Sequence, residues 1–240
     1  MKLRIRSSFS KQLLLLTLVS SALFLPAQLF AQKTFQGIVT FKLDAQGNSP
    51  NSFTYYLKGD KARMEMEMPA QAQMGKAAFI IDGGKREMIT LIPQMKMYMQ
   101  MQMSPVDSTG DNGKADDGEK PVKVGDTEVI LGHKCDHWRI NDEDGGTVDL
   151  WNAKGFGNFM MPGSMSGMPG GGRQPQWIKD MMSQGFFPLK VVVTKKDGST
   201  EMSMVATKIE EKDLSSSLFE VPSGYNKMNI PNMGNMGRQN

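Results

Sequence analysis

Methionine and polar residues alternate strictly between Met95 and Met103. Every second residue is methionine, and the residues between them are Lys96, Tyr98, Gln100 and Gln102. Successive side chains of a β-strand point to opposite faces of the sheet, so this pattern predicts a strand with five methionines on one face. The same pattern recurs on a smaller scale in residues 62–68, where charged residues alternate with Met64, Met66 and Met68.

Alternating apolar and polar residues predict a sheet along the whole chain. In the first half the predicted strands are 35–43, 52–58, 62–68, 78–82, 87–92 and 95–103. Turn-forming residues such as Asp82-Gly83-Gly84-Lys85 separate them, which is typical of an antiparallel meander. In the second half the predicted strands are 122–124, 127–131, 133–140, 147–151, 189–194 and 200–209. The fold class is therefore mainly β (α+β).

One or two short helices interrupt the strand pattern. Residues 175–184 read as a helix, because Pro175 lies near the first turn and Gly185 follows the last. Its apolar stripe contains Trp177, Ile178, Met181 and Met182. A helical turn is also expected within residues 213–222.

The polar, Gly-rich stretches 104–120 and 156–173 are predicted to be flexible loops, and 228–240 a disordered tail. The remaining sequence, 32–227, is predicted to form a single β-rich domain.

The N-terminus has the features of a secretory signal peptide. Basic residues precede the apolar stretch 13–25, and Ala31 is a small residue at the expected cleavage point. No stop-transfer pattern follows, so we expect a cleaved signal at 1–31, no transmembrane segment in the mature chain, and a periplasmic or secreted protein.

Removal of this signal also changes the sign of the net charge. Residues 1–31 contain four basic residues and no acidic one, so the formal charge falls from +3 to −1. The basic character belongs to the signal, and the sequence gives no reason to expect nucleic-acid binding.

The second half carries a family resemblance. Leu131-Gly132, Cys135 and Trp138, then Gly185-Phe-Phe-Pro-Leu-Lys190 and Leu218-Phe-Glu-Val-Pro-Ser-Gly-Tyr225, are similar to segments of the domain-of-unknown-function 4412 family of exported bacterial proteins. The similarity extends over roughly 35–225. That family in turn resembles the periplasmic lipoprotein-carrier class. The resemblance implies a curved antiparallel sheet, or open half-barrel, whose concave apolar face is covered by helices and binds acyl chains. It implies no functional residue.

Three interpretations of the methionine pattern remain open. The methionines could fill an ordinary core, or form a soft-metal site, since thioethers select Cu(I). Residues i and i+2 on a strand lie roughly 6.5–7 Å apart, so this spacing is not diagnostic of a metal. They could also line a cavity for apolar ligands under the helix 175–184. The candidate lining residues are Met64, Met66, Met68, Met95, Met97, Met99, Met101, Met103, Trp177 and Met181.

A second candidate site is the triplet His133, Cys135 and His137. Imidazole and thiolate ligands at alternate positions of one strand suit copper or zinc. The alternative is a buried structural cysteine between two rim histidines. Cys135 is the only cysteine of the chain, so no internal disulfide is possible.

No motif indicates an enzyme. The chain has no GxGxxG, P-loop, HExxH, CxxC or GxSxG sequence. The sequence therefore predicts a non-enzymatic exported protein without a cofactor, which binds an apolar small molecule, a lipid or a lipoprotein on its methionine face. A periplasmic copper-binding protein and a purely structural envelope protein are the alternatives.

Overall fold

The computed structural model describes residues 34–45, 52–68, 75–103, 120–125, 127–141, 145–159 and 185–228. In its first half these residues form β1 (Gly37–Ala45), β2 (Ser52–Lys58), β3 (Lys61–Glu67), β4 (Lys76–Asp82), β5 (Glu87–Ile92) and β6 (Met97–Gln102). In the second half they form β7 (Val122–Lys123), β8 (Glu128–Ile130), β9 (His133–Asn141), β10 (Thr147–Ala153), β11 (Phe187–Thr194), β12 (Thr200–Glu211) and β13 (Asn226–Lys227). The predicted signal peptide, the predicted helix 175–184 and almost all of loop 104–120 lie outside the described residues.

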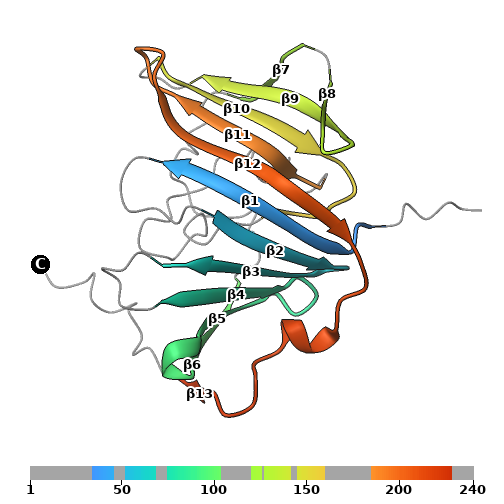
Figure 1. Ribbon diagram of the computed structural model, residues 1–240, viewed down its shortest axis with the longest axis vertical. Helices are drawn as coiled ribbons and strands as arrows, with labels where there is room; N and C mark the ends of the chain where they lie inside the picture. Colours follow the sequence, from blue (N-terminus) through green and yellow to red (C-terminus); the bar gives the residue numbers. More distant parts are fainter. Residues whose placement is uncertain are drawn as a thin grey trace, which may run out of the picture. The chain divides into compact units, whose positions relative to one another are not determined.

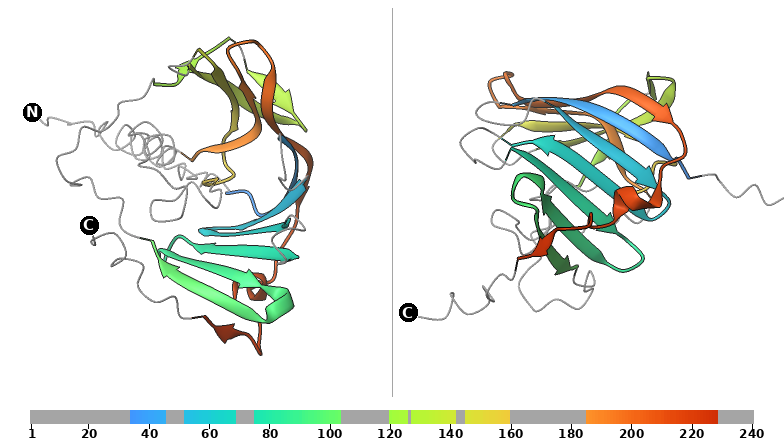
Figure 2. Two further views of the ribbon diagram at one scale, coloured as in Figure 1. Left: turned by 90° about the vertical axis from the view of Figure 1, so that its left-hand side faces the viewer. Right: turned by 60° about the horizontal axis from the view of Figure 1, so that its bottom comes forward.

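The thirteen strands form one curved, open sheet (Figures 1 and 2). Their order is β13-β6-β5-β4-β3-β2-β1-β12-β11-β10-β9-β7, and β8 pairs with β9. β1 to β6 follow each other as the predicted meander. β12 then pairs with β1 from Gly37↔Glu211 to Ala45↔Met202 and joins the two halves of the chain. The predicted fold class, mainly β with a curved antiparallel sheet, is confirmed.

The predicted strand 95–103 begins two residues later than its pattern suggested. Met95 ends a single 3₁₀ turn, η2 (Pro93–Met95), and its side chain is 56% exposed. The next residue, Lys96, has a left-handed conformation with φ of 48°, and its N–H donates to the Pro93 carbonyl oxygen at 3.2 Å. Proline fixes φ near the helical value and has no N–H for a strand ladder. The turn that begins at Pro93 therefore keeps Met95, the first methionine of the alternating segment, out of the strand.

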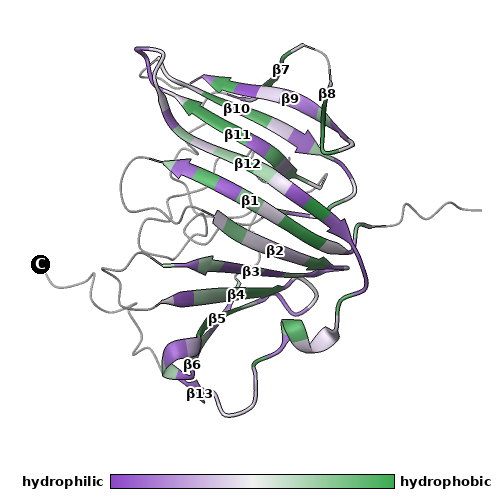
Figure 3. Ribbon diagram, in the orientation of Figure 1, coloured by the Kyte–Doolittle hydropathy of each residue, from purple (hydrophilic) through white to green (hydrophobic). Residues whose placement is uncertain are grey.

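The two faces of the sheet carry separate apolar clusters, because central strands such as β4 bury side chains on both faces. Hydrophobic and hydrophilic residues are interspersed along the other strands (Figure 3). We call one of the two faces the methionine face. It runs from β6 to β9, and its fully buried side chains include Val39, Phe41, Tyr55, Met64, Phe187, Leu189 and Met204. The opposite face, built on Ala78, Ile80 and Leu91, is the outer face. The sheet bends so that its concave side is the one opposite η3 (Ser216–Phe219), which lies on the outer face (Figure 2).

The C-terminal segment closes the outer face. Leu214 and Phe219 are buried against Ala78, Ile80 and Leu91. Arg63 Nη1 donates to the Leu218 carbonyl oxygen at 2.8 Å. Lys58 Nζ donates to the Leu214 carbonyl oxygen at 2.5 Å. This segment contains the helical turn predicted within 213–222, and it covers the face that carries no methionine row.

Truncation of Phe219 tests this closure. We expect Phe219→Ala to lower the free energy of unfolding by about 3–5 kcal/mol, because a buried phenyl ring is replaced by a cavity. Urea denaturation followed by tryptophan fluorescence measures the effect. The matched control is Glu220→Ala at the exposed neighbouring position, for which we expect a change within about 0.5 kcal/mol. Equal effects of the two substitutions would show that the segment is not packed on the sheet.

Candidate functional site: the methionine face

Cross-strand pairing assembles the methionine face in rows. Directly paired residues of antiparallel strands lie on the same face. One row runs across β2 to β6 as Tyr55, Met64, Phe79, Thr90 and Met99. A second row runs as Leu57, Ala62, Ile81, Met88 and Met101. The sheet therefore brings methionines from three strands, far apart in sequence, to one surface.

Aromatic rings form the centre of this face. Phe41 stacks on Phe53 with ring centroids 4.9 Å apart. Phe159 lies over Tyr55 at 5.2 Å, and Phe156 lies over Phe187 at 5.2 Å. Sequence reasoning identified some of these rings as strand residues but assigned none of them to the candidate site.

The segment that follows β10 supplies two of these rings. Phe156 is 2% exposed and Phe159 is 9% exposed. The Phe159 N–H donates to the Phe186 carbonyl oxygen at 2.7 Å. Residues 156–159, predicted to begin a flexible loop 156–173, instead pack on the methionine face, and residues 160–173 lie outside the described part of the chain. The apolar residues Phe156 and Phe159 could have indicated a packed segment, but they lie in a Gly-rich stretch that is typical of a loop.

The structure brings most of the predicted methionines together. Met64 is fully buried in the core. Four others are partly buried and pack against that core: Met66, Met68, Met101 and Met103. Met97 and Met99 are half-buried on the same face of β6. Met88, Met202 and Met204 join them.

One predicted site residue, Met95, is not part of this assembly, and two others cannot be compared with it. Met95 lies in the 3₁₀ turn, outside the row that Met97 begins. Trp177 and Met181 lie outside the described residues, so their place in the site stays a prediction.

The triplet His133, Cys135 and His137 occupies alternate positions of β9, as predicted, but each side chain has a separate environment. Cys135 is fully buried, and its thiol donates to the His133 carbonyl oxygen with an Sγ–O distance of 3.5 Å. The His133 ring packs edge-on against Phe156 at 4.9 Å. Within the described ranges, no three His, Cys, Asp or Glu side chains are grouped so that they could hold a metal ion.

His137 is held by a carboxylate and an indole ring. Its Nε2 lies 2.6 Å from Asp149 Oδ1, and its ring stacks on Trp151 at 4.3 Å. Arg139 Nε donates to the same Asp149 oxygen at 2.9 Å. Burial disfavours the charged Asp149 carboxylate, but the hydrogen bonds from Arg139 and His137 outweigh burial and lower the pKa of Asp149. The imidazole is therefore engaged in a polar cluster that stabilises the sheet.

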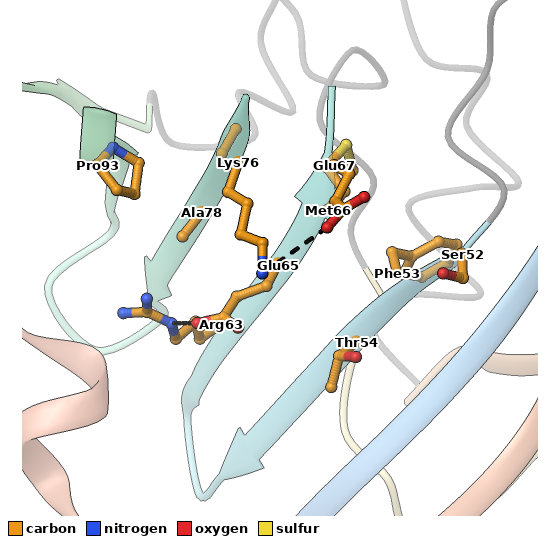
Figure 4. Close-up of a pocket in the computed structure, with 11 residues that line it drawn as sticks. Ser52, Phe53, Thr54, Arg63, Glu65, Met66, Glu67, Lys76, Ala78 and Pro93 are labelled. Carbon is orange, nitrogen blue, oxygen red and sulfur yellow. Dashed lines mark hydrogen bonds and ion pairs between the residues drawn. The ribbon is translucent and has the colours of Figure 1, made fainter. Parts of the chain in front are cut away.

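A cavity of about 260 Å³ lies beside β2, β3 and β4, and its lining combines charged residues with Phe53, Met66 and Ala77 of the methionine face (Figure 4). Two ion pairs line it: Arg63 Nε–Glu65 Oε1 at 2.7 Å and Lys76 Nζ–Glu67 Oε1 at 3.7 Å. Thr54, Glu65 and Ala78 are paired across the strands on the outer face. The two ion pairs distinguish this hollow from the rest of the methionine face, which is apolar.

The burial of Cys135 predicts an unreactive thiol. Burial raises the pKa of Cys135 to about 11, so the thiol is protonated at neutral pH. We expect alkylation by iodoacetamide at pH 8 to be slower in the native protein than in urea by about a hundredfold or more. Mass spectrometry at successive times measures the rate, and the urea-unfolded protein is the control. Native labelling as fast as in urea would contradict the buried position.

Comparison with solved structures gives distant matches that extend over most of this chain. An uncharacterized conserved protein from Thermus thermophilus has 7% sequence identity and a TM-score of 0.47, over 82% of this chain and 91% of that chain. MucB in the Pseudomonas aeruginosa MucA/MucB complex has 11% identity and a TM-score of 0.44, over 79% of this chain and 56% of its own. A putative outer membrane lipoprotein-sorting protein domain from Vibrio parahaemolyticus has 11% identity and a TM-score of 0.31, over 77% of this chain and 89% of that chain.

Two further findings complete the comparison. The curated proteins contain no match to this chain. In the part of the chain that the structure describes, no helix has the length and apolar character that a membrane span requires.

Sequence comparison with protein families gives a match over nearly the whole predicted domain. Residues 35–225 match the family described as Domain of unknown function (DUF4412). This confirms the resemblance inferred from the sequence, and the protein belongs to the DUF4412 family.

Proposed function

We propose that this protein is an exported, non-enzymatic binding protein that holds an apolar ligand on its methionine face. The ligand is a lipid or the acyl chain of a lipoprotein. The observation that carries the proposal is the continuous apolar face from β6 to β9, bordered by methionines that remain only partly buried. Export rests on the signal peptide predicted at 1–31.

The described residues cover the methionine face only in part along β6, where Met97, Met99 and Met101 stay half-buried, and this supports ligand binding. A sheet must bury an apolar face against a second layer. The outer face has its cover in the segment around Leu214 and Phe219. Over the methionine face, the described residues supply Phe156 and Phe159 but no helix. An apolar ligand would complete the layer beside the partly buried methionines.

Methionine suits such a ligand. Its side chain is unbranched and polarizable, so it adapts to the shape of its partner. Methionine-rich surfaces accommodate variable apolar partners for this reason. Met66, Met68, Met101 and Met103 therefore form a border that can repack around a flexible chain. Affinity would come from buried apolar area, at about 25 cal/mol per Å², reduced by the cost of ordering the ligand.

The chemistry of the face also supports binding without reaction. The thioether, phenyl and aliphatic side chains that make up most of this face cannot transfer protons. The nearby thiol of Cys135 is buried with a raised pKa, which disfavours the nucleophilic thiolate. His137 is bound to Asp149 and stacked on Trp151.

Native mass spectrometry tests the proposal directly. The protein is expressed with its signal in its native host, purified from the exported fraction and analysed under gentle conditions. We expect a lipid that co-purifies with the protein and that organic extraction removes. Extracted protein should then bind the apolar fluorophore N-phenyl-1-naphthylamine. A protein that carries no lipid and binds no fluorophore would overturn the proposal.

A charge placed on the methionine face should weaken binding. We expect Met101→Lys to weaken fluorophore affinity by about tenfold or more, because the ammonium group would be desolvated beside the apolar ligand. The matched control is Gln102→Lys, one residue along β6, which is exposed and paired with Glu87. It should bind like the wild type. Urea denaturation of both variants verifies that they fold. Equal loss of binding in the two variants would exclude the methionine face as the site.

A further inference from the structure

One polar atom on the methionine face is buried without a partner. The Thr90 hydroxyl oxygen has no hydrogen-bond partner, and it is the one buried side-chain polar atom in this condition among the described residues. Thr90 as a whole is 7% exposed. It lies in β5, directly between Phe79 of β4 and Met99 of β6.

This hydroxyl is costly where it lies. Buried polar groups in folded proteins nearly always have a hydrogen-bond partner, and an unpaired one lowers stability. Met88 and Ile92, its neighbours on the same face of β5, are apolar. Valine has nearly the same shape and would fill the position without an unpaired group. The hydroxyl therefore stabilises nothing in the unliganded protein.

We propose that the Thr90 hydroxyl donates a hydrogen bond to a carbonyl oxygen of the bound ligand. The ligand is then an acyl chain in ester or amide linkage, not a plain hydrocarbon. This inference rests on the proposed function and names the ligand class for the same face.

The surroundings of Thr90 favour an uncharged carbonyl over a carboxylate. The side chains beside it in its row and strand are Phe79, Met88, Ile92 and Met99. None of them carries a positive charge, so the carboxylate of a free fatty acid would be buried without a counter-charge. An ester or amide oxygen accepts the hydrogen bond without that cost.

Met99 gives the ligand a way to reach this hydroxyl. It borders Thr90 on β6 and is only half-buried. Its flexible thioether chain can rotate aside, whereas Phe79 on the other side is 8% exposed and packed in the core. The carbonyl would approach from the β6 side, where Met101 and Met103 are also partly buried.

Substitution of Thr90 by valine tests the hydrogen bond. The probes are methyl laurate, n-tridecane and laurate, which compete with N-phenyl-1-naphthylamine for the lipid-extracted protein. We expect Thr90→Val to weaken methyl laurate binding by about fivefold to tenfold, the usual effect of one lost hydrogen bond. Tridecane binding should stay unchanged. The urea midpoint of the unliganded variant should rise, because the unpaired hydroxyl is gone.

Two further variants separate the hydroxyl from packing. Thr90→Ser keeps a hydroxyl and should retain the preference of the wild type for methyl laurate over tridecane. Thr54→Val removes a hydroxyl from the outer face of β2 and should leave both affinities unchanged.

The outcomes distinguish this inference from the proposed function. If Thr90→Val lowers ester and hydrocarbon binding equally, or leaves ester binding unchanged, the hydrogen bond does not exist while apolar binding stands. If the wild type prefers laurate to its methyl ester, the uncharged ligand class is wrong. If the wild type binds none of the three probes, the proposed function and this inference fall together.

Discussion

The pairing of β1 with β12 is the contact on which the rest of the structure depends. It joins residues separated by most of the chain, and it makes one sheet from the meander β1–β6 and the strands β9–β12. A bulge between Thr40 and Phe41 shifts the register, so that Phe41 lies opposite Ala206. The ring of Phe41 can then contact Phe53 in the first half and Phe187 in the second. Without this pairing, the methionine face would be two narrow surfaces.

The two apolar faces of the sheet are covered in different ways. On the outer face, the chain supplies its own cover, and cationic side chains of β2 and β3 hold that cover by its backbone carbonyl oxygens. These bonds fix the position of the segment independently of side-chain packing. On the methionine face, flexible side chains border the aromatic centre instead. A fixed cover and an adaptable border have different uses, and only the second can accept ligands of variable shape.

The sequence predicts local structure well because period-two alternation is a local property. It located both ends of each of the first five strands to within two residues. It failed at Met95, because proline chemistry at Pro93 outweighs alternation, and at residues 156–159, because two apolar residues in a Gly-rich stretch carry no periodicity. Long-range features could not be read in the same way. Nothing local in Leu43 or Met204 indicates that they pair, since register between distant strands depends on the whole sheet.

The presence or absence of a hydrogen-bond partner distinguishes Cys135 and His137 from Thr90. Cys135 and His137 have the reactive side chains that first suggest a site, but the fold satisfies both: the thiol is bonded to a carbonyl oxygen, and the imidazole is bound to Asp149. The position of Thr90 among apolar residues of a strand is visible in the sequence. That its hydroxyl has no hydrogen-bond partner is visible only in the three-dimensional structure. A buried group that is already bonded has its cost of desolvation offset within the protein. The described residues offer the Thr90 hydroxyl no such partner, and we propose that on this face the partner is the ligand.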